Sequence, residues 1–311
     1  MTTKVFIAGK NGMVGSALVR LYDSQTEFQV ISPSRQELDL LDRNQVFEFI
    51  ANVKPDLAID AAARVGGIVD NNSYPVDFLS INLQIQTNLM DAAAAASVNS
   101  FVFLGSSCIY PKLAPQPLKE SYLMTGPLEE TNSAYAVAKI AGLRLIQAYR
   151  EQFGFNWIST MPTNLYGPND NFDFKSSHVI PGFIAKFHRA KIENAQTVEL
   201  WGTGNPLREF LHVDDLAQAI KFVAENYNDY EFINIGSGEE VTIKQLADLV
   251  KKTINYQGDI IWNSSYPDGT PRKFLDSSKI SNLGWKPKIS LEAGLKDTYS
   301  WYLENLNKFN T

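Results

Sequence analysis

The chain has 311 residues, 44% of them hydrophobic and 20% charged, and its net charge is −6. This composition excludes a disordered chain, a collagen and a small disulfide-stapled protein. The excess of acidic residues, 34 against 28 basic, disfavours nucleic acid or an anionic membrane as a partner. The single cysteine, Cys108, excludes an intrachain disulfide, so we expect a cytoplasmic location. No apolar run reaches the ~18 residues of a membrane span.

The N-terminal half alternates short apolar runs with helical patterns. Strands are predicted at Val5–Ala8, Phe28–Ile31, Leu57–Ala61, Phe101–Leu104 and Trp157–Thr160. Helices are predicted at Val14–Leu21, Asn44–Ala51, Leu83–Ala95 and Ala136–Phe153. Short strands that are apolar on both faces and alternate with helices are typical of a sheet covered on both sides. The sequence therefore predicts an α/β fold with a doubly wound, Rossmann-like parallel sheet.

The C-terminal half loses this alternation and becomes rich in loops. Phe232–Ile235 predicts one more strand of the main sheet, and Thr242 with Gln245 predicts a capping box before an amphipathic helix. We therefore predict two domains. Residues 1–165, with about 210–236, would form the dinucleotide-binding domain, and 166–209 with 237–311 would form a smaller α/β substrate domain.

A glycine-rich loop follows the first strand directly and opens a helix. Its sequence is Gly9-Lys10-Asn11-Gly12-Met13-Val14-Gly15. Glycines at this spacing let the turn tighten and let backbone N–H groups approach a pyrophosphate at the helix N-terminus. The alternative is a plain glycine turn, but the strand before it and the helix after it favour dinucleotide binding.

The end of the second strand indicates which dinucleotide is bound. A carboxylate there would hold the ribose 2′-hydroxyl of NAD, but this position reads Ser32-Pro33-Ser34-Arg35. Arg35 could instead pair with a 2′-phosphate, which favours NADPH; the alternative is that Arg35 faces solvent. Asp39 and Leu40 follow and would border the adenine pocket.

Two further features suggest carbonyl chemistry. Tyr135 and Lys139 lie four residues apart on one predicted helix, where a lysine cation would favour the phenolate and make the tyrosine a usable acid. Ser106 follows a predicted parallel strand at the edge where this architecture binds ligands. Its hydroxyl could hydrogen-bond a substrate carbonyl. Taken singly, an ordinary amphipathic helix and a self-capping serine turn would explain them.

Together, the glycine loop, the serine-rich strand end and Tyr-x-x-x-Lys resemble the extended short-chain dehydrogenase/reductases that act on nucleotide sugars. The resemblance runs from the first strand almost to the C-terminus. Its further motifs are Leu104–Lys112, Met161–Pro168, Ser177–Pro181, Arg208–Asp215 and Pro267–Lys273. It implies a 3,5-epimerase/4-reductase that converts GDP-4-keto-6-deoxy-D-mannose to GDP-L-fucose with NADPH.

The resemblance also implies the catalytic roles. The C4 ketone of this substrate acidifies the protons at C3 and C5, and Cys108 and His178 would form the acid–base pair that inverts both carbons. Ser106 and Tyr135 would hold the C4 oxygen, and Tyr135 would give the proton in the reduction while Lys139 lowers its pKa. Without the resemblance, a lone cysteine is more often a small buried hydrophobic residue.

The remaining site residues are likewise implied by the resemblance. The cofactor would contact Leu104, Gly105, Lys139, Pro162, Thr163, Asn164, Leu165 and His178. The GDP part would contact Lys186, Trp201, Arg208 and Asp268. Asn11 and Lys186 each stand where relatives carry arginine, which leaves Arg35, with Lys10, to bind a 2′-phosphate. No metal is expected. A homodimer is expected through the helices Leu83–Ala95 and Ala136–Phe153.

Other functions stay open on the sequence alone. A nucleotide-sugar 4-epimerase of the same fold would retain NAD and need no Cys/His pair, and a simple 4-reductase would reduce without epimerising. A non-catalytic dinucleotide-sensing module is the alternative outside enzymes, but the intact pair of Tyr135 and Lys139 argues against it. Because a fold hosts many functions, the decision rests on the site residues.

Overall fold

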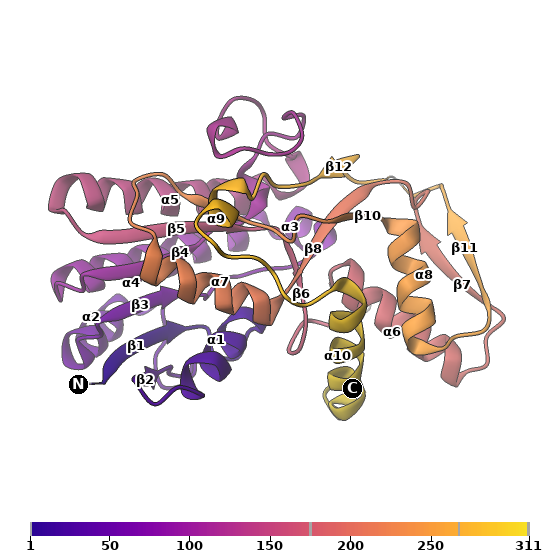
Figure 1. The fold of residues 1–311 in the computed structure, drawn as a ribbon, viewed down its shortest axis with the longest axis horizontal. Coiled ribbons are helices and arrows are strands. Elements are labelled where there is room, and N and C mark those ends of the chain that lie inside the picture. The colour runs from indigo at the N-terminus through magenta and orange to yellow at the C-terminus, as the bar shows by residue number, and fades with distance from the viewer. Residues whose placement is uncertain (1, 174–175, 267, 310–311) are drawn as a thin grey trace.

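The computed structural model describes residues 2–173, 176–266 and 268–309, so Pro267 of the last quoted motif lies outside the described residues. A six-stranded sheet has the order β2-β1-β3-β4-β5-β9, and every pairing in it is parallel (Figure 1). Its strands are β1 Thr3–Ala8, β2 Phe28–Ile31, β3 Leu57–Asp60, β4 Ser100–Leu104, β5 Asn156–Pro162 and β9 Ile233–Ile235. The predicted fold class is confirmed.

Helices cover both faces of this sheet because side chains alternate along each strand. In β1, Val5 and Ile7 pack in the core that includes α1 and α7, whereas Phe6 and Ala8 pack in the core that includes α2, α4 and α5. The helices of this part are α1 Met13–Asp23, α2 Arg43–Val53, the short α3 Ile68–Ser73, α4 Asn82–Ala95, α5 Ser133–Phe153 and α7 Val213–Asn226. All four helices predicted in the N-terminal half are present.

Most of the remaining elements lie together at the right of Figure 1, away from the main sheet, whereas α9 lies beside the main sheet. Strand β8 pairs with β6, β10 and β12, and β7 pairs with β11. These strands are β6 Asn164–Tyr166, β7 Thr197–Trp201, β8 Leu207–His212, β10 Glu240–Thr242, β11 Asp259–Asn263 and β12 Arg272–Lys273. The helices are α6 Val179–Ile192, α8 Ile243–Ile254, α9 Ser278–Asn282 and α10 Leu291–Glu304. The predicted capping box at Thr242 is confirmed at the start of α8.

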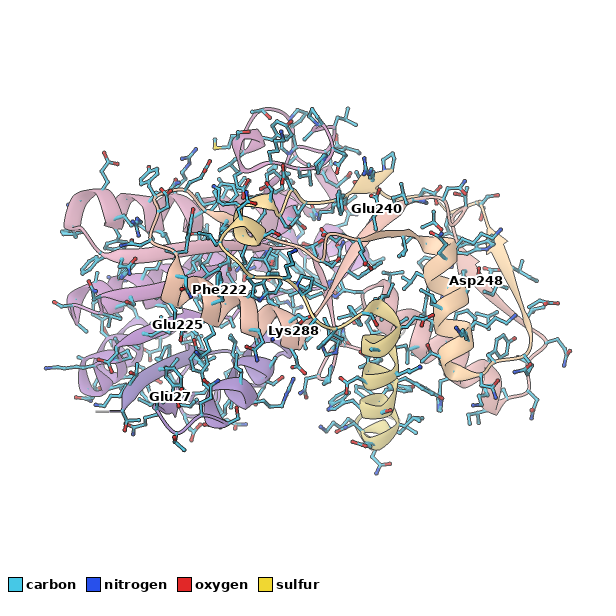
Figure 2. All side chains as sticks on the ribbon, viewed as in Figure 1. Glu27, Phe222, Glu225, Glu240, Asp248 and Lys288 are labelled. Atoms are coloured by element: carbon cyan, nitrogen blue, oxygen red, sulfur yellow. The ribbon has the colours of Figure 1, made fainter. Side chains whose placement is uncertain are left out.

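The chain crosses between its two halves several times. After β8 it returns through α7 to β9, which pairs with β5, as expected from the sequence. The buried Asp215 of α7 accepts hydrogen bonds from the backbone N–H groups of Lys288 and Ile289 just before α10. Lys288 is labelled in Figure 2. Trp285, which the predicted boundaries assign to the second domain, packs in the α1/α7 core. The division into two domains stays a prediction.

The described helices include none with both the length and the apolar character needed to cross a membrane. The longest described helix, α5, has 21 residues and mixes buried apolar positions with charged ones such as Lys139 and Arg150.

Truncation in the sheet should show how much stability the core supplies. Ile59 of β3 is fully buried in the α1/α7 core. Ile59→Ala is expected to lower the free energy of unfolding by about 2–5 kcal/mol, because it removes buried methylenes and leaves a cavity. Urea unfolding measures this loss. The control Ile192→Ala, at a position 67% exposed, should change stability by less than about 0.5 kcal/mol; equal losses in both variants would contradict the described core.

Candidate active site

The glycine loop is built for close approach of a phosphate group. Gly9 has φ +89°, a conformation that favours glycine, and a side chain there would meet the Ala61 carbonyl. A Cβ on Gly15 would lie 2.0 Å from the Gly9 carbonyl oxygen, so α1 packs directly on the turn. Gly12 caps α1 without a side chain, which leaves the helix N-terminus open. The strand order reverses at β1, where this architecture binds its ligands. These residues fit a dinucleotide.

Gly15 should tolerate no side chain. Gly15→Ala is expected to destabilise the protein by about 3 kcal/mol or more, because the new methyl group meets backbone atoms that cannot turn away. It should also abolish measurable dinucleotide binding in calorimetric titration. In Gly12→Ala the Cβ would lie 3.4 Å from the Gly9 carbonyl oxygen, an ordinary contact. This control should lower the free energy of unfolding of the ligand-free protein by about 1 kcal/mol or less. An equal loss in both variants would refute the steric argument.

The residues predicted to read the adenosine end lie around β2. Arg35 is exposed, with no ion pair recorded among the described residues. Lys10 is ion-paired with Glu37 at 3.2 Å, so its charge is compensated. Backbone and side-chain hydrogen bonds from Ser34, together with Lys10, lower the pKa of Glu37 to about 2. Asp39 accepts from the Leu41 backbone, and Asn88 holds the Leu40 carbonyl at 2.9 Å. Arg35 is therefore the cation available to a 2′-phosphate.

The residues predicted for the nicotinamide end follow β4 and β5 at their carboxyl ends. Gly105 donates its N–H to the Thr160 carbonyl at 2.9 Å, and a Cβ there would meet the Met161 sulfur. Pro162 ends β5. The Thr163 hydroxyl and the Asn164 amide both donate to the Glu209 backbone carbonyl, and Leu165 lies half-buried in β6. The segment that follows β5 is therefore held against β8.

Ser106, Tyr135 and Cys108 meet where β4 ends. The Ser106 hydroxyl oxygen accepts the Cys108 backbone N–H at 3.3 Å, which caps the short 3₁₀ turn of Ser107–Ile109. Tyr135, in the first turn of α5, shares a hydrogen bond with the same serine side chain, and this bond lowers its pKa. Two hydroxyl groups from elements far apart in sequence thus lie together at the predicted carbonyl site.

Lys139 is buried next to Tyr135. Its buried amine donates to the Leu104 carbonyl at 2.8 Å and lies 5.9 Å from the centre of the Tyr135 ring. Burial raises the pKa of Tyr135, and its hydrogen bond with Ser106 opposes this rise; the lowering expected from Lys139 stays a prediction. Two negative groups, Cys108 and Asp60, add to that rise. Desolvation is therefore the largest cause of the raised pKa of Tyr135.

Asp60 is a buried carboxyl group that the sequence analysis did not single out. It ends β3, is 1% exposed, and its Oδ1 accepts the Ala62 N–H, whereas its Oδ2 has no hydrogen-bond partner among the described atoms. Burial raises its pKa to about 6 against the opposing charge of Lys139. The carboxyl group in turn raises the pKa of Lys139, which burial lowers. The two side chains form an electrostatic pair beneath Tyr135.

Cys108 has two polar neighbours that the sequence did not place there. The Asn132 amide nitrogen lies 3.4 Å from its sulfur, and the Lys273 amine lies 3.6 Å from the same atom. Asn132 stands three residues before Tyr135, and Lys273 closes the last quoted motif. Both positions were visible in the sequence, but nothing in the chain order joins them to Cys108.

His178 begins α6 and has its own acidic partner. Its Nδ1 lies 4.0 Å from Oδ1 of the buried Asp170, and the imidazole side chain is 49% exposed. The Asp170 carboxylate raises the pKa of His178, while burial and the charge of Lys273 oppose this rise. The imidazole thus lies within electrostatic reach of the lysine that also contacts Cys108. An imidazolium held by a carboxylate can act as a proton donor.

The residues predicted to bind GDP form two contact groups. The Lys186 amine lies over the Trp201 ring, 5.0 Å from its centre, and Trp201 stacks on Tyr266 at 4.3 Å. Trp201 is 54% exposed, as a ring that contacts a base would be. Tyr266 was missed, because an aromatic residue in a polar loop carries no signal of its partner. Burial lowers the pKa of Lys186.

The second group lies on β8 and the loop after Gly202. Asp268 accepts from the Thr203 backbone at 2.9 Å and from its hydroxyl at 2.6 Å, and these bonds lower the pKa of Asp268. Arg208 interacts electrostatically with Asp268, although burial lowers its pKa. It also stands opposite Lys273 in the pairing of β8 with β12. Two cations on neighbouring strands suit a diphosphate.

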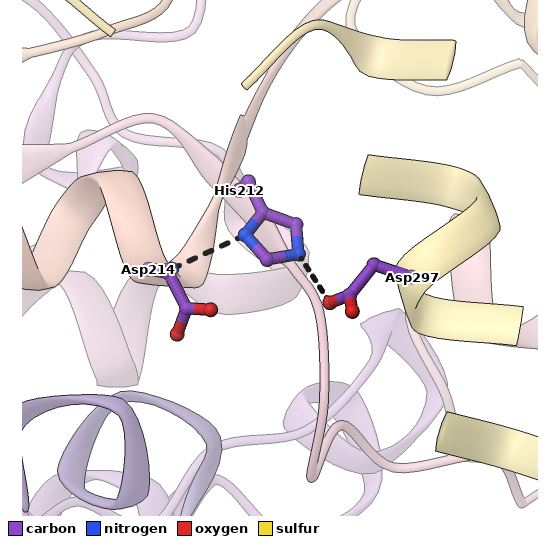
Figure 3. Close-up of side chains that lie close together, drawn as sticks. All are labelled: His212, Asp214 and Asp297. Carbon is purple, nitrogen blue, oxygen red and sulfur yellow. Dashed lines mark hydrogen bonds and ion pairs between the residues drawn. The ribbon is translucent and has the colours of Figure 1, made fainter. Parts of the chain in front are cut away.

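His212 contacts the start of α7 and a residue of α10. Its Nδ1 accepts the backbone N–H of Asp214 at 3.3 Å, which caps α7, and its Nε2 faces the Asp297 carboxylate at 3.2 Å (Figure 3). The three side chains offer ligand atoms close enough together for a metal ion. Because Nδ1 is used as an acceptor, the ring proton lies on Nε2 toward Asp297, and burial lowers the pKa of the ring. This arrangement is that of a hydrogen-bonded cap.

Comparison with known proteins agrees with this geometry. The model of the NAD dependent epimerase/dehydratase family matches residues 5–236. Over 305 residues the chain is 55% identical to the Arabidopsis thaliana protein named putative GDP-L-fucose synthase 2, covering 98% of this chain and 93% of that protein. It is 49% identical to GDP-L-fucose synthase of Escherichia coli (strain K12), over 98% of each chain. A solved structure, a GDP-L-fucose synthetase from Naegleria fowleri bound to NADP, has a TM-score of 0.91 at 28% identity and covers 100% of this chain and 97% of that one.

Proposed function

Because the chain belongs to the NAD dependent epimerase/dehydratase family, we propose that it converts GDP-4-keto-6-deoxy-D-mannose to GDP-L-fucose. The enzyme inverts C3 and C5 of the sugar and then reduces the ketone at C4. The observation that carries this conclusion is the identity of 55% and 49% to proteins named for that activity, over 98% of this chain in both cases.

One ketone activates all three steps, which is why a single site serves them. Removal of a proton next to the ketone leaves an enolate, and the hydroxyl groups of Ser106 and Tyr135 are placed to hydrogen-bond its C4 oxygen. Cys108 takes the proton from C3 or C5, and His178 returns one to the opposite face. Both carbons lie beside C4, so a small shift of the sugar ring brings each to the same pair.

NADPH is the cofactor, and when bound it supplies the hydride for C4. The glycine loop from Gly9 to Gly15 would hold its pyrophosphate, and Arg35 its 2′-phosphate. The Tyr135 hydroxyl gives its proton to the C4 oxygen as the alkoxide forms. Lys139, whose amine donates to the Leu104 carbonyl, would hold the cofactor beside that hydroxyl. Burial lowers the pKa of Lys139, and the nearby Asp60 carboxyl group opposes this lowering.

Arg35 should determine the preference for the phosphorylated cofactor. Arg35→Ala is expected to reduce the ratio of NADPH to NADH affinity roughly 10- to 100-fold, because a charge-assisted pair with phosphate is lost. Fluorescence titration with each cofactor measures the ratio. Arg20→Ala is the control, since Arg20 is ion-paired with Asp214 of α7. An unchanged ratio in Arg35→Ala would mean that another residue determines the preference for NADPH over NADH.

The direct test of the function is NADPH consumption with GDP-4-keto-6-deoxy-D-mannose, followed by NMR of the product sugar. GDP-L-fucose is expected. A reduced sugar that keeps the configuration at C3 and C5 would instead indicate a simple 4-reductase and remove Cys108 and His178 from the proposed roles. Turnover with neither cofactor would reject the proposed substrate.

The proposal includes a homodimer in the cytoplasm. On α5, Val137 and Phe153 are 45% and 57% exposed, and such apolar positions suit helix packing against a second copy. Light scattering of the purified protein tests the dimer. A reducing compartment suits Cys108, because a proton-accepting thiol must stay reduced.

A further inference from the structure

Cys108 can act as a base only when it carries a negative charge, and two segments distant in sequence bring donors to its sulfur. The Lys273 amine lies 3.6 Å away, on β12, and the Asn132 amide nitrogen lies 3.4 Å away, just before α5. We propose that Lys273, assisted by Asn132, is a positioning residue that holds Cys108 as the thiolate base of the reaction. This inference rests on the proposed function for the identity of the reaction.

The amine of Lys273 is available to interact with the Cys108 sulfur. Among the described residues, no ion pair includes Lys273, and the sulfur of Cys108 is the hydrogen-bond partner recorded for its amine. A cation within about 4 Å of an ionisable group favours the negative form of that group. Other lysines of the chain, such as Lys112 with Glu129, are compensated by carboxylates.

The backbone around Lys273 is fixed on both sides. The Arg272 guanidinium forms two hydrogen bonds, of 2.8 and 2.7 Å, with the Glu240 carboxylate, which ties β12 to β10 across β8. The Phe274 N–H donates to the Gln116 side chain at 3.0 Å. The Leu275 N–H donates to the buried Glu209 at 3.1 Å. These contacts orient the Lys273 amine toward the Cys108 sulfur before any substrate binds.

Asn132 contacts the Cys108 sulfur and does not cap α5 with its side chain. It occupies the N-cap position of α5, where an asparagine side chain normally accepts a backbone N–H of the first turn. Here it makes no such bond, and its amide nitrogen points to the Cys108 sulfur while its buried Oδ1 has no partner among the described atoms. A side chain that breaks a local rule in this way usually serves a site.

The charge state of the sulfur fits the proton balance of each epimerisation. The thiolate takes the proton, and the electron pair of that C–H bond forms the enolate double bond as the carbonyl pair moves to the C4 oxygen. The imidazolium of His178 then gives its proton to the opposite face of the carbon, and the enolate collapses to the ketone. Cys108 ends as a thiol and His178 as neutral imidazole, so one proton must pass from the thiol to the imidazole through solvent before the next inversion.

The test uses the full chain without substrate, so its result does not depend on which sugar the enzyme takes. Cys108 is the single cysteine, so alkylation by iodoacetamide reports on it alone. The pH midpoint of the alkylation rate is expected to rise by about 1–2 units in Lys273→Met, because the paired cation is lost. Lys273→Arg should retain most of the parent midpoint. Lys112→Met, four positions after Cys108 and exposed, is the control and should leave it unchanged.

A second variant keeps the proposal testable if Lys273→Met does not fold. Asn132→Asp has nearly the same shape, suits an N-cap, and places a negative charge beside the sulfur, so it should also raise the midpoint. Urea unfolding and NADPH titration establish that each variant is folded. Unchanged midpoints in Lys273→Met and Asn132→Asp would overturn the proposal. If Lys273→Met leaves the midpoint unchanged but weakens GDP binding, Lys273 is instead a diphosphate ligand beside Arg208.

Discussion

Tyr135→Phe is expected to lower the rate of NADPH oxidation about 10²- to 10⁴-fold, because the phenol is the group placed to give a proton to the C4 oxygen. Burial raises the pKa of Tyr135, so the hydroxyl is fully protonated at neutral pH and poised as an acid. The phenylalanine ring keeps the edge-on contact with Phe78, so the fold should be preserved. Absorbance at the nicotinamide band measures the rate.

The same variant should still exchange protons at C3 and C5. Ser106 remains as a donor to the enolate oxygen, so deuterium from heavy water should enter the substrate at a rate closer to that of the parent. Mass spectrometry of the recovered substrate measures this exchange. Tyr74→Phe, at a position 54% exposed, serves as the matched control and should leave both rates unchanged. Parental NADPH oxidation in Tyr135→Phe would reject Tyr135 as the acid.

Cys108→Ser is expected to produce the second large effect, on epimerisation. A hydroxyl group stays neutral near pH 7 where a thiol can ionise, so removal of the C3 and C5 protons should fall about 10²- to 10⁴-fold. Because reduction follows the inversions, GDP-L-fucose formation should fall with them. Deuterium exchange and product NMR measure both.

The affinity of Cys108→Ser for NADPH should remain that of the parent, because the residues proposed to hold the cofactor do not include Cys108. His178→Gln gives a useful comparison, since loss of the acid should still permit deuterium exchange at the face where Cys108 acts. A Cys108→Ser enzyme that exchanges deuterium at the parental rate would remove the thiol from the mechanism, and an equal loss of NADPH affinity would indicate a structural role.

Most of the fold was predicted from local patterns in the sequence. The strands of the main sheet are apolar on both faces, and the helices between them are long enough to show their own period, so each could be recognised in isolation. The described strands outside the main sheet were not predicted. β6, β10 and β12 have three residues or fewer, and they form because β8 lies between them and offers backbone partners.

The amino-acid sequence by itself determined the doubly wound sheet, the glycine loop, and the residue types that resemblance assigns to the chemistry, because these depend on spacing along the chain. Tertiary structure alone decided what surrounds them. Lys273 reaches Cys108 across 165 positions, Lys10 is paired with Glu37, and Asp60 lies buried near Lys139. Charge and desolvation depend on distances in space, which is why burial sets the direction of the pKa shift of Tyr135.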